Sequence, residues 1–191
     1  MPGYARPTSL TGLQKQLAGQ YESFKHGQLG NYLGNNPQVL MCPRDKATST
    51  GTNSKLFLQR SIKLTSYTWN GNIIFFHNKP SPATGSYWET IPSKVRKISA
   101  TDPGDIVQWE TDDTSPYWFN DAGNQPAEGI SQRHKTGGTN KNNRQDVGGA
   151  ATVGIVSGAS INLTYKKFYA MAQTGGRPAA PNDIWWGSSS R

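Results

Sequence analysis

The sequence predicts an α+β fold in which an N-terminal helix packs on an antiparallel β-sheet with long loops. Near the N-terminus apolar residues recur at steps of three and four, whereas later apolar runs are short and rich in β-branched or aromatic residues. The 21 glycines and 12 prolines indicate many turns. A chain of 191 residues has the length of one domain and can bury a core without a metal or a disulfide. We therefore expect a single domain over residues 1–191 and not a helical bundle.

The N-terminal part, residues 1–34, is predicted to be helical. Ser9 is a favourable capping residue, and Gly27 and Gly30 break the helix that follows it. The apolar pattern then continues to Leu33 in a second short turn. We expect one face of the helix to cover the sheet through Leu10, Leu13, Leu17, Tyr21 and Phe24.

The sheet region is expected between residues 38 and 172. Its strands are predicted at residues 39–42, 64–69, 73–77, 106–110, 150–156 and 160–164. Asn70-Gly71 is the preferred pair of a type I′ turn, so the second and third of these runs should form a hairpin. Ser157-Gly158 should close another hairpin between the last two runs.

The remaining segments are predicted to be loops, short helices and a tail. Loops are expected at residues 43–53, 79–85, 112–132 and 135–146, helical segments at 91–98 and 165–172, and an extended tail over 173–191. Within the third loop, Tyr117, Trp118 and Phe119 are expected to anchor the chain. The fourth loop is poor in apolar residues, so we expect it to be mobile.

The charges are distributed unevenly along a chain whose net charge is +8. Seven of the twelve acidic residues lie between positions 102 and 128, where there is no Lys or Arg. Two interpretations stay open. The asymmetry creates one negative and one positive surface, which suits head-to-tail association between copies, or the segment is an acidic surface loop on an ordinary basic protein.

The residue patterns of common catalytic sites are missing. Three histidines, His26, His77 and His134, have no paired spacing, and the chain has neither a phosphate-binding GxxxxGK[ST] loop nor a Gly-x-Ser-x-Gly elbow. The single cysteine, Cys42, lies in an apolar run, which favours a buried structural thiol; a disulfide to a partner or a reactive group is the alternative. We do not expect an enzyme.

Three short motifs occur in order along the chain. Two of them are the Cys-Pro-x-Asp step that ends at Asp45 and the Ser-Tyr-x-x-Asn element that ends at Asn70. In the third, His134 leads through polar sequence into an apolar run closed by Ser157-Gly158. Together they resemble prepilin-type secretion proteins, a pseudopilin-like family related to type II secretion protein G. Residues 1–5 resemble the stretch after the family's membrane helix, and residues 182–186 resemble its Trp-bearing tail.

The sequence also departs from the family pattern. Ser157-Gly158 stands where the family has Asp-Gly, and His134 precedes this turn by 23 positions, which is more than usual. The basic leader and the long apolar helix of the family are missing, since the longest aliphatic or aromatic run is Ile73–Phe76. We therefore expect the chain as written to be soluble, with the helix processed, cut away or supplied by another chain.

The resemblance implies a non-catalytic structural subunit of a type II secretion or type IV pilus-type filament, at the surface of or outside a bacterial cell. Its partners would be other copies of itself or a separate helical pilin-like chain, with membrane contact only through the missing helix. Structural roles are implied for the motif residues, which are Cys42, Pro43, Asp45, Tyr67, Asn70, His134, Ser157 and Gly158. The candidates for partner contact are Leu10, Leu13, Leu17, Trp185 and Trp186.

Individual roles follow for His134 and for the acidic loop. We expect the His134 ring to bond backbone near the Ser157-Gly158 hairpin, and Arg133 to pair with the acidic segment. Pseudopilins often carry a calcium loop near the C-terminal sheet, so calcium is the one cofactor hypothesis, with ligands at Asp112, Asp113, Asn120 and Asp121. The alternative is a solvated acidic loop without a cofactor.

Two other classes of function stay open. A secreted carbohydrate- or surface-binding module would use exposed Trp and Tyr side chains, although most of the six tryptophans are expected in the core. A nucleic-acid-binding protein would use the positive charge, but no basic helix or aromatic-basic sheet motif supports it. No small-molecule substrate is expected.

Overall fold

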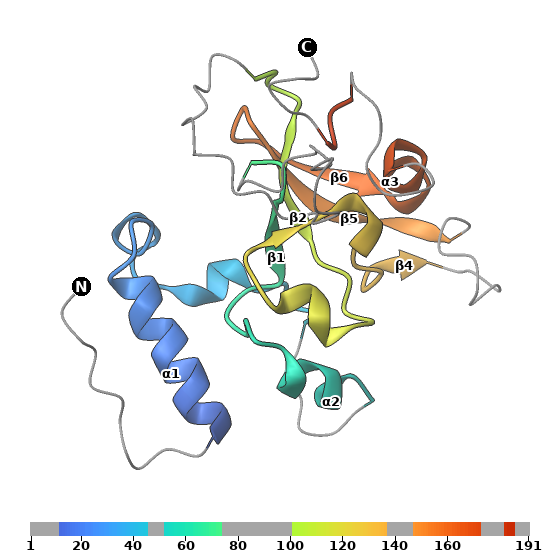
Figure 1. Cartoon of the computed structure of the whole chain (residues 1–191). Helices are drawn as coiled ribbons and strands as arrows, with labels where there is room; N and C mark the ends of the chain where they lie inside the picture. The colour runs from blue at the N-terminus through green and yellow to red at the C-terminus, as the bar shows by residue number, and fades with distance from the viewer. Residues whose placement is uncertain (1–11, 46–51, 74–100, 137–146, 173–181, 186–191) are drawn as a thin grey trace, which may run out of the picture. The chain divides into compact units, whose positions relative to one another are not determined.

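The computed structural model describes residues 12–45, 52–73, 101–136, 147–172 and 182–185 (Figure 1). The chain divides into two compact units. We call Met1–Tyr67 with Asp113–Ala122 the helical unit, and Thr68–Asp112 with Gly123–Arg191 the sheet unit. Helices and a multi-stranded sheet are both present, so the α+β class is confirmed. The single-domain organisation stays a prediction.

The expected N-terminal helix is present as α1 (Gly12–Lys25). Its Gln20 side chain accepts bonds from the backbone N–H groups of Lys63 (2.8 Å) and Leu64 (3.1 Å), which ties the helix to the chain before the sheet. No residue of α1 is buried, so its apolar face is only half covered. Ser9 and Leu10 lie outside the described residues, and packing of the helix on the sheet stays a prediction.

The chain reverses closely over the C-terminus of α1 at Gly30. A Cβ atom at this position would lie 2.5 Å from the carbonyl oxygen of Phe24 and 2.7 Å from that of Lys25. Only glycine fits so close an approach without a shift of the backbone. The 3₁₀ turn η1 (Asn31–Leu33) follows, as expected for the second short turn.

The predicted strand at residues 39–42 is wrong, because this part of the chain forms the 3₁₀ turn η2 (Pro37–Leu40). The Asn36 side-chain oxygen accepts a bond from the Gln38 N–H, and Pro37 occupies the first position, where its missing N–H costs nothing. Helix α2 (Thr52–Gln59) was not expected and shortens the predicted loop 43–53. Ile62 then donates its N–H to Phe119 O (2.8 Å), which joins the two parts of the helical unit.

The type I′ turn predicted at Asn70-Gly71 is also wrong. Such a turn needs positive φ at both central residues, and neither residue has it. Strand β1 (Tyr67–Asn70) instead ends in a turn in which Ile73 N–H bonds to Asn70 O (2.9 Å). The rest of the predicted strand 73–77, the loop 79–85 and the helical turn 91–98 lie outside the described residues.

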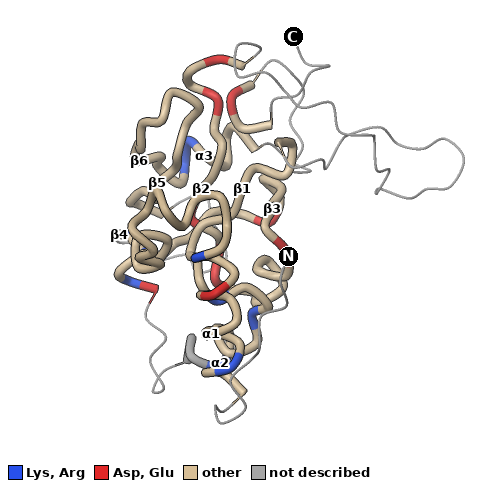
Figure 2. Tube along the Cα trace, turned by 90° about the vertical axis from the view of Figure 1, so that its left-hand side faces the viewer, with Lys and Arg blue, Asp and Glu red and all other residues tan. Residues whose placement is uncertain are grey.

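The sheet has the strand order β3-β1-β2-β5-β4, with β6 paired to β5 (Figure 2). Its other strands are β2 (Ile106–Glu110), β3 (Gly123–Asn124), β4 (Lys135–Thr136), β5 (Gly148–Ile155) and β6 (Ser160–Thr164). The β2–β5, β4–β5 and β5–β6 pairs are antiparallel, and β1–β3 is parallel. The predicted strand 106–110 and the hairpin through Ser157-Gly158 are confirmed, the latter with φ of 84° at Gly158.

The core of the sheet unit lies between β2, β5, β6 and helix α3 (Tyr165–Ala172), whose predicted bounds are confirmed. Trp109 and Phe168 meet edge to face, 5.9 Å apart. Ile184 and Trp185 of the C-terminal segment are buried in the same cluster. Aromatic side chains thus share this core with aliphatic ones such as Ile130, Val153 and Leu163.

The segment predicted as irregular at residues 112–132 contains only short elements, among them the 3₁₀ turns η4 (Pro116–Phe119) and η5 (Pro126–Glu128). Phe119 is buried as expected, Trp118 is half-buried, and Tyr117 is 62% exposed, so Tyr117 is not an anchor. Of the loop predicted at 135–146, residues 135–136 form β4. None of the helices among the described residues combines the length and the apolar character needed to cross a membrane.

Replacement of Gly30 by alanine should destabilise the helical unit, because the new Cβ meets two backbone carbonyl oxygens. We expect Gly30→Ala to lower the free energy of unfolding by about 1–3 kcal/mol in urea denaturation. Gly19→Ala is the matched control. It lies inside α1 with open space around it, so it should raise stability by roughly 0.5–1 kcal/mol. Equal effects of the two changes would contradict the close approach at Gly30.

Candidate functional site

Two of the motifs that suggested a family meet in one buried cluster in the helical unit. Asp45 Oδ2 accepts bonds from Arg60 Nη1 (2.8 Å) and from Ser66 Oγ (2.7 Å). Ser66 Oγ in turn accepts the backbone N–H of Cys42 (3.0 Å). Cys42 is buried, as expected. The Cys-Pro-x-Asp step and the start of the Ser-Tyr-x-x-Asn element are therefore held together through one carboxylate and one hydroxyl.

Arg60 is the cation of this cluster, and sequence reasoning missed it. Its guanidinium lies over the rings of Phe119 (3.8 Å) and Phe57 (5.0 Å) while it pairs with Asp45. The flat, delocalised cation can stack on aromatic rings and bind a carboxylate at the same time. Arg60 directly follows α2, the helix that was not expected, so no pattern pointed to it.

Lys63 places a second cationic side chain beside this cluster. The residue is buried, and its ammonium group donates to the backbone carbonyl of Arg60. Burial, and then the charge of Arg60, lower the pKa of Lys63. Both effects disfavour the protonated amine.

In the sheet unit, the buried Asn70 amide connects three segments. Its Nδ2 donates to Ile106 O (2.9 Å) at the start of β2 and to Ile184 O (2.7 Å) in the C-terminal segment. Its Oδ1 accepts the N–H of Asn72 (3.0 Å). The expected structural role of Asn70 thus has a physical basis, while Tyr67 is half-buried and Pro43 exposed.

The side chain of His134 lies against Glu110, a fully buried residue at the end of β2. His134 Nε2 is 3.2 Å from Glu110 Oε1, and Arg133 Nη1 is 3.9 Å from the same oxygen. Glu110 Oε2 accepts the N–H of Thr152 on β5 (3.2 Å). The predicted pairing of Arg133 with the acidic segment is confirmed. The His134 ring thus lies against a carboxylate, and its predicted bond to backbone near Ser157-Gly158 stays a prediction.

Both clusters serve to hold segments together. Ser66 and Glu110 have no exposed surface, so a substrate in solution cannot reach the hydroxyl or the carboxylate. A nucleophile needs an activating base and access to a substrate. Each cluster joins parts of the chain that are far apart in sequence, and this is a structural task.

The proposed calcium ligands are divided between the two units. Asp112 belongs to the sheet unit and is buried, whereas Asp113, Asn120 and Asp121 belong to the helical unit. A metal site needs at least three ligand side chains close together. Within the described parts of the chain, none of these aspartates belongs to such a group of Asp, Glu, His or Cys side chains. The geometry therefore adds no support to the calcium hypothesis.

The acidic segment 102–128 offers less negative surface than its charge count suggested. Three of its seven acidic residues, Asp105, Glu110 and Asp112, are buried. Asp105 Oδ2 accepts the N–H of Asp102 (2.8 Å). Burial, together with the nearby Asp183 carboxylate, raises the pKa of Asp105 to about 6. Part of the segment thus builds the interior of the sheet unit and adds nothing to its surface charge.

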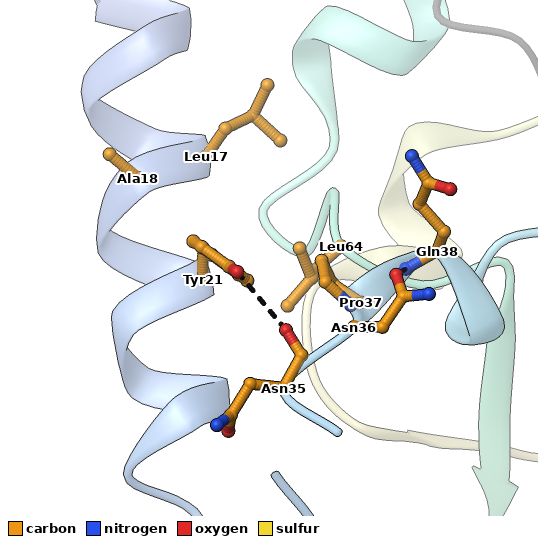
Figure 3. Close-up of a pocket in the computed structure, with 8 residues that line it drawn as sticks. All are labelled: Leu17, Ala18, Tyr21, Asn35, Asn36, Pro37, Gln38 and Leu64. Atoms are coloured by element: carbon orange, nitrogen blue, oxygen red, sulfur yellow. Dashed lines mark hydrogen bonds between the residues drawn. The ribbon is translucent and has the colours of Figure 1, made fainter. Parts of the chain in front are cut away.

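A pocket of about 570 Å³ lies in the helical unit between α1 and the segment around η2 (Figure 3). The Tyr21 hydroxyl donates to Asn35 O (3.1 Å) across one side of it. Asn35 has φ of 54°, the one positive value among the described non-glycine residues. The pocket is lined by Leu17, Ala18, Tyr21, Asn35, Asn36, Pro37, Gln38 and Leu64.

The candidates for partner contact have different surroundings. Leu17 lines this pocket and Leu13 is half-buried, so both present apolar surface. Trp185 is buried in the sheet unit, and its burial does not support contact with a partner. Leu10 and Trp186 lie outside the described residues.

Comparison with known proteins gives no relative. No family model, no curated protein and no solved structure matches the chain. The interpretation of its function therefore rests on its own residues and their geometry.

Loss of the Asp45 carboxylate should strongly destabilise the chain, because Arg60 would stay buried without its charge partner. We expect Asp45→Ala to lower the free energy of unfolding by about 3–5 kcal/mol in urea denaturation. The double variant Asp45→Ala/Arg60→Met should recover much of this loss, since it removes the buried charge as well. Asp121→Ala, at an exposed position, is the control, with a change below about 0.5 kcal/mol. A double variant no more stable than Asp45→Ala would contradict the role of the ion pair.

The raised pKa of Asp105 predicts a specific dependence of stability on pH. Protonated Asp105 is favoured by folding, so this contribution is complete below about pH 4 and is lost as pH rises through about 6. Asp105→Asn keeps an uncharged side chain. The stability of the variant relative to the wild type should therefore increase between pH 4 and pH 7, by on the order of 3 kcal/mol at most. A difference that stays constant across this range in thermal or urea unfolding would disprove the assignment.

Proposed function

We propose that this chain is the globular part of a pilin-like or pseudopilin-like subunit, a non-catalytic structural protein of a type II secretion or type IV pilus-type filament. Its partners are other copies of itself or a separate helical pilin-like chain, at the surface of a bacterial cell or outside it. In this proposal α1 belongs to the N-terminal helical part, which packs on the sheet as in pilins. No cofactor is needed for this role.

The observation that carries the proposal is the placement of the motif residues. Asp45 binds Ser66, Asn70 binds the carbonyl group of Ile184, 114 positions away, and His134 lies against Glu110. Three of the residues that resemble the family thus hold distant segments together. Motif residues with structural tasks fit a family of structural subunits better than a family of enzymes, whose motif residues must meet a substrate.

The half-covered face of α1 supports a helical partner. Leu13 and Leu17 present apolar surface on this helix, and Leu17 continues into the pocket with Leu64 and Pro37. An amphipathic helix from another chain would cover such a surface with its own apolar side chains. The exposed side of α1 carries polar residues such as Gln16, so one face of the helix is distinguished from the other.

The rival reading as a carbohydrate-binding module has weaker support. Such modules need several aromatic rings exposed side by side. Of the four tryptophans among the described residues, Trp109 and Trp185 are buried, Trp118 is half-buried and Trp69 is 40% exposed. Among the tyrosines, Tyr32 is 87% exposed and Tyr117 is 62% exposed, and the Tyr117 ring meets the ring of Trp118 edge to face, 5.6 Å apart. This pair is the surface that such a module would use.

The proposal is tested first by the form of the protein in its native source. We expect the intact mass and N-terminal sequence to reveal a longer form that begins with a methylated apolar helix, or else the present chain in complex with a small helical protein. A native start at Met1 without any helical partner would overturn the filament proposal and favour the binding module.

The helical partner, if it is a separate chain, should depend on the apolar face of α1. We expect Leu17→Lys to abolish its co-purification with the protein, because a charge would replace the apolar contact. Gln16→Lys introduces the same charge on the exposed side of the helix and should leave the complex intact. Loss of the complex in both variants, or in neither, would contradict this site of contact.

A further inference from the structure

Strand β6 forms an open edge of the sheet. Among the described strands it pairs only with β5, and it lies at the outer side of the sheet in Figure 2. Ser160, Ile161, Asn162 and Thr164 are exposed, and only Leu163 is buried. Among the described residues, no strand lies on the side of β6 that faces away from β5.

This edge lacks the usual protection against pairing with another strand. Natural edge strands are commonly interrupted by a charged side chain, a proline or a β-bulge. Residues 160–164 contain no charge and no proline, although the chain has 20 Lys and Arg residues. The register with β5 is regular from Ala150↔Thr164 to Gly154↔Ser160, so there is no bulge either.

The hydrogen bonds of β5 show which backbone groups of β6 point outward. The Thr152 N–H bonds to Glu110 Oε2, on the side of β2 and away from β6. Thr152 and its register partner Asn162 therefore form a non-hydrogen-bonded pair. At the other side of β6, the N–H and C=O of Asn162 point to the open edge, as do those of Ser160 and Thr164, two residues away in each direction.

The side chains of β6 are complementary to themselves. In an antiparallel pair centred on Asn162, Ile161 would lie opposite the partner's Leu163, and Ser160 opposite the partner's Thr164. Ile161 is 40% exposed on the face where Leu163 enters the core, so the partner strand would cover it. The two Asn162 residues would exchange N–H···O=C bonds, and no charge would be buried.

We infer that β6 is a self-association site, at which the β6 strand of a second copy of this chain adds antiparallel and continues the sheet across a two-fold axis. A two-fold contact uses the same surface on both copies, which the sequence Ser-Ile-Asn-Leu-Thr allows. The inference goes beyond the proposed function, because it concerns the sheet unit alone and such a dimer forms whether or not the subunit joins a filament. A pair of five-residue strands is a small interface, so the association is weak.

Disulfide trapping tests this geometry directly. Directly opposite residues in a hydrogen-bonded pair have Cα atoms about 5.5 Å apart, within the range that a disulfide spans. We expect Asn162→Cys to form a covalent dimer under mild oxidation about tenfold faster than Ala170→Cys, which places an exposed thiol on α3 of the same unit. The wild type, whose single cysteine is buried, gives the background rate. Equal rates for the two variants would overturn the inference.

Sedimentation velocity at several hundred micromolar protein tests the unmodified edge. We expect a monomer–dimer equilibrium in the wild type that Ile161→Lys weakens about tenfold, because two like charges would enter the paired strands. Ala170→Lys adds the same charge on α3 and should dimerise like the wild type. A monomeric wild type, or a dimer unaffected by Ile161→Lys, would overturn the inference. Neither result would alter the mass and partner tests of the proposed function.

Discussion

The sheet unit depends on one side-chain amide, that of Asn70. Strand β1 has four residues, and its neighbour β3 has two, so their ladder alone offers few hydrogen bonds. The amide adds bonds to the carbonyl groups of Ile106 and Ile184, which brings the start of β2 and the C-terminal segment to the same point. A backbone bond from the Ile106 N–H to Asp183 O (2.8 Å) joins the same two segments beside it. Once the segment is held, Ile184 and Trp185 can complete the core.

Buried charged side chains also hold distant segments together, and they do so in both units. Only 34% of the residues are hydrophobic, so polar side chains must also enter the interior. Asp45 pairs with the Arg60 cation in the helical unit, and Glu110 lies 3.9 Å from the Arg133 cation in the sheet unit. A buried charge must be paired with an opposite charge, because an unpaired buried charge is strongly destabilising. These pairs therefore restrict which segments can meet, whereas apolar contacts alone would restrict them less.

Local patterns predicted the elements that depend on local energetics. Helices α1 and α3, strand β2 and the Ser157-Gly158 hairpin follow from periodicity and turn preference. The errors occur where a residue bonds to a partner that is far away in the sequence. The Asn70 side chain bonds to Ile106 and Ile184, and Asn70 does not form a type I′ turn. The partners of Asp45 and His134 were missed for the same reason. Arg60 and Glu110 lie 15 and 24 positions from them, and nothing in the sequence relates such pairs.

The buried motif residues and the surfaces open to partners have different tasks. Asp45 and Asn70 are buried, so they act on other molecules only through the fold that they hold. An edge strand is recognised mainly through its backbone, and its sequence signal is little more than the absence of charge. From the sequence alone, Ile161 therefore cannot be told apart from any other strand residue. Its position at an open edge can be recognised only from the register with β5. That register shows that the backbone groups next to Ile161 point outward and that its side chain lies at the border of the core.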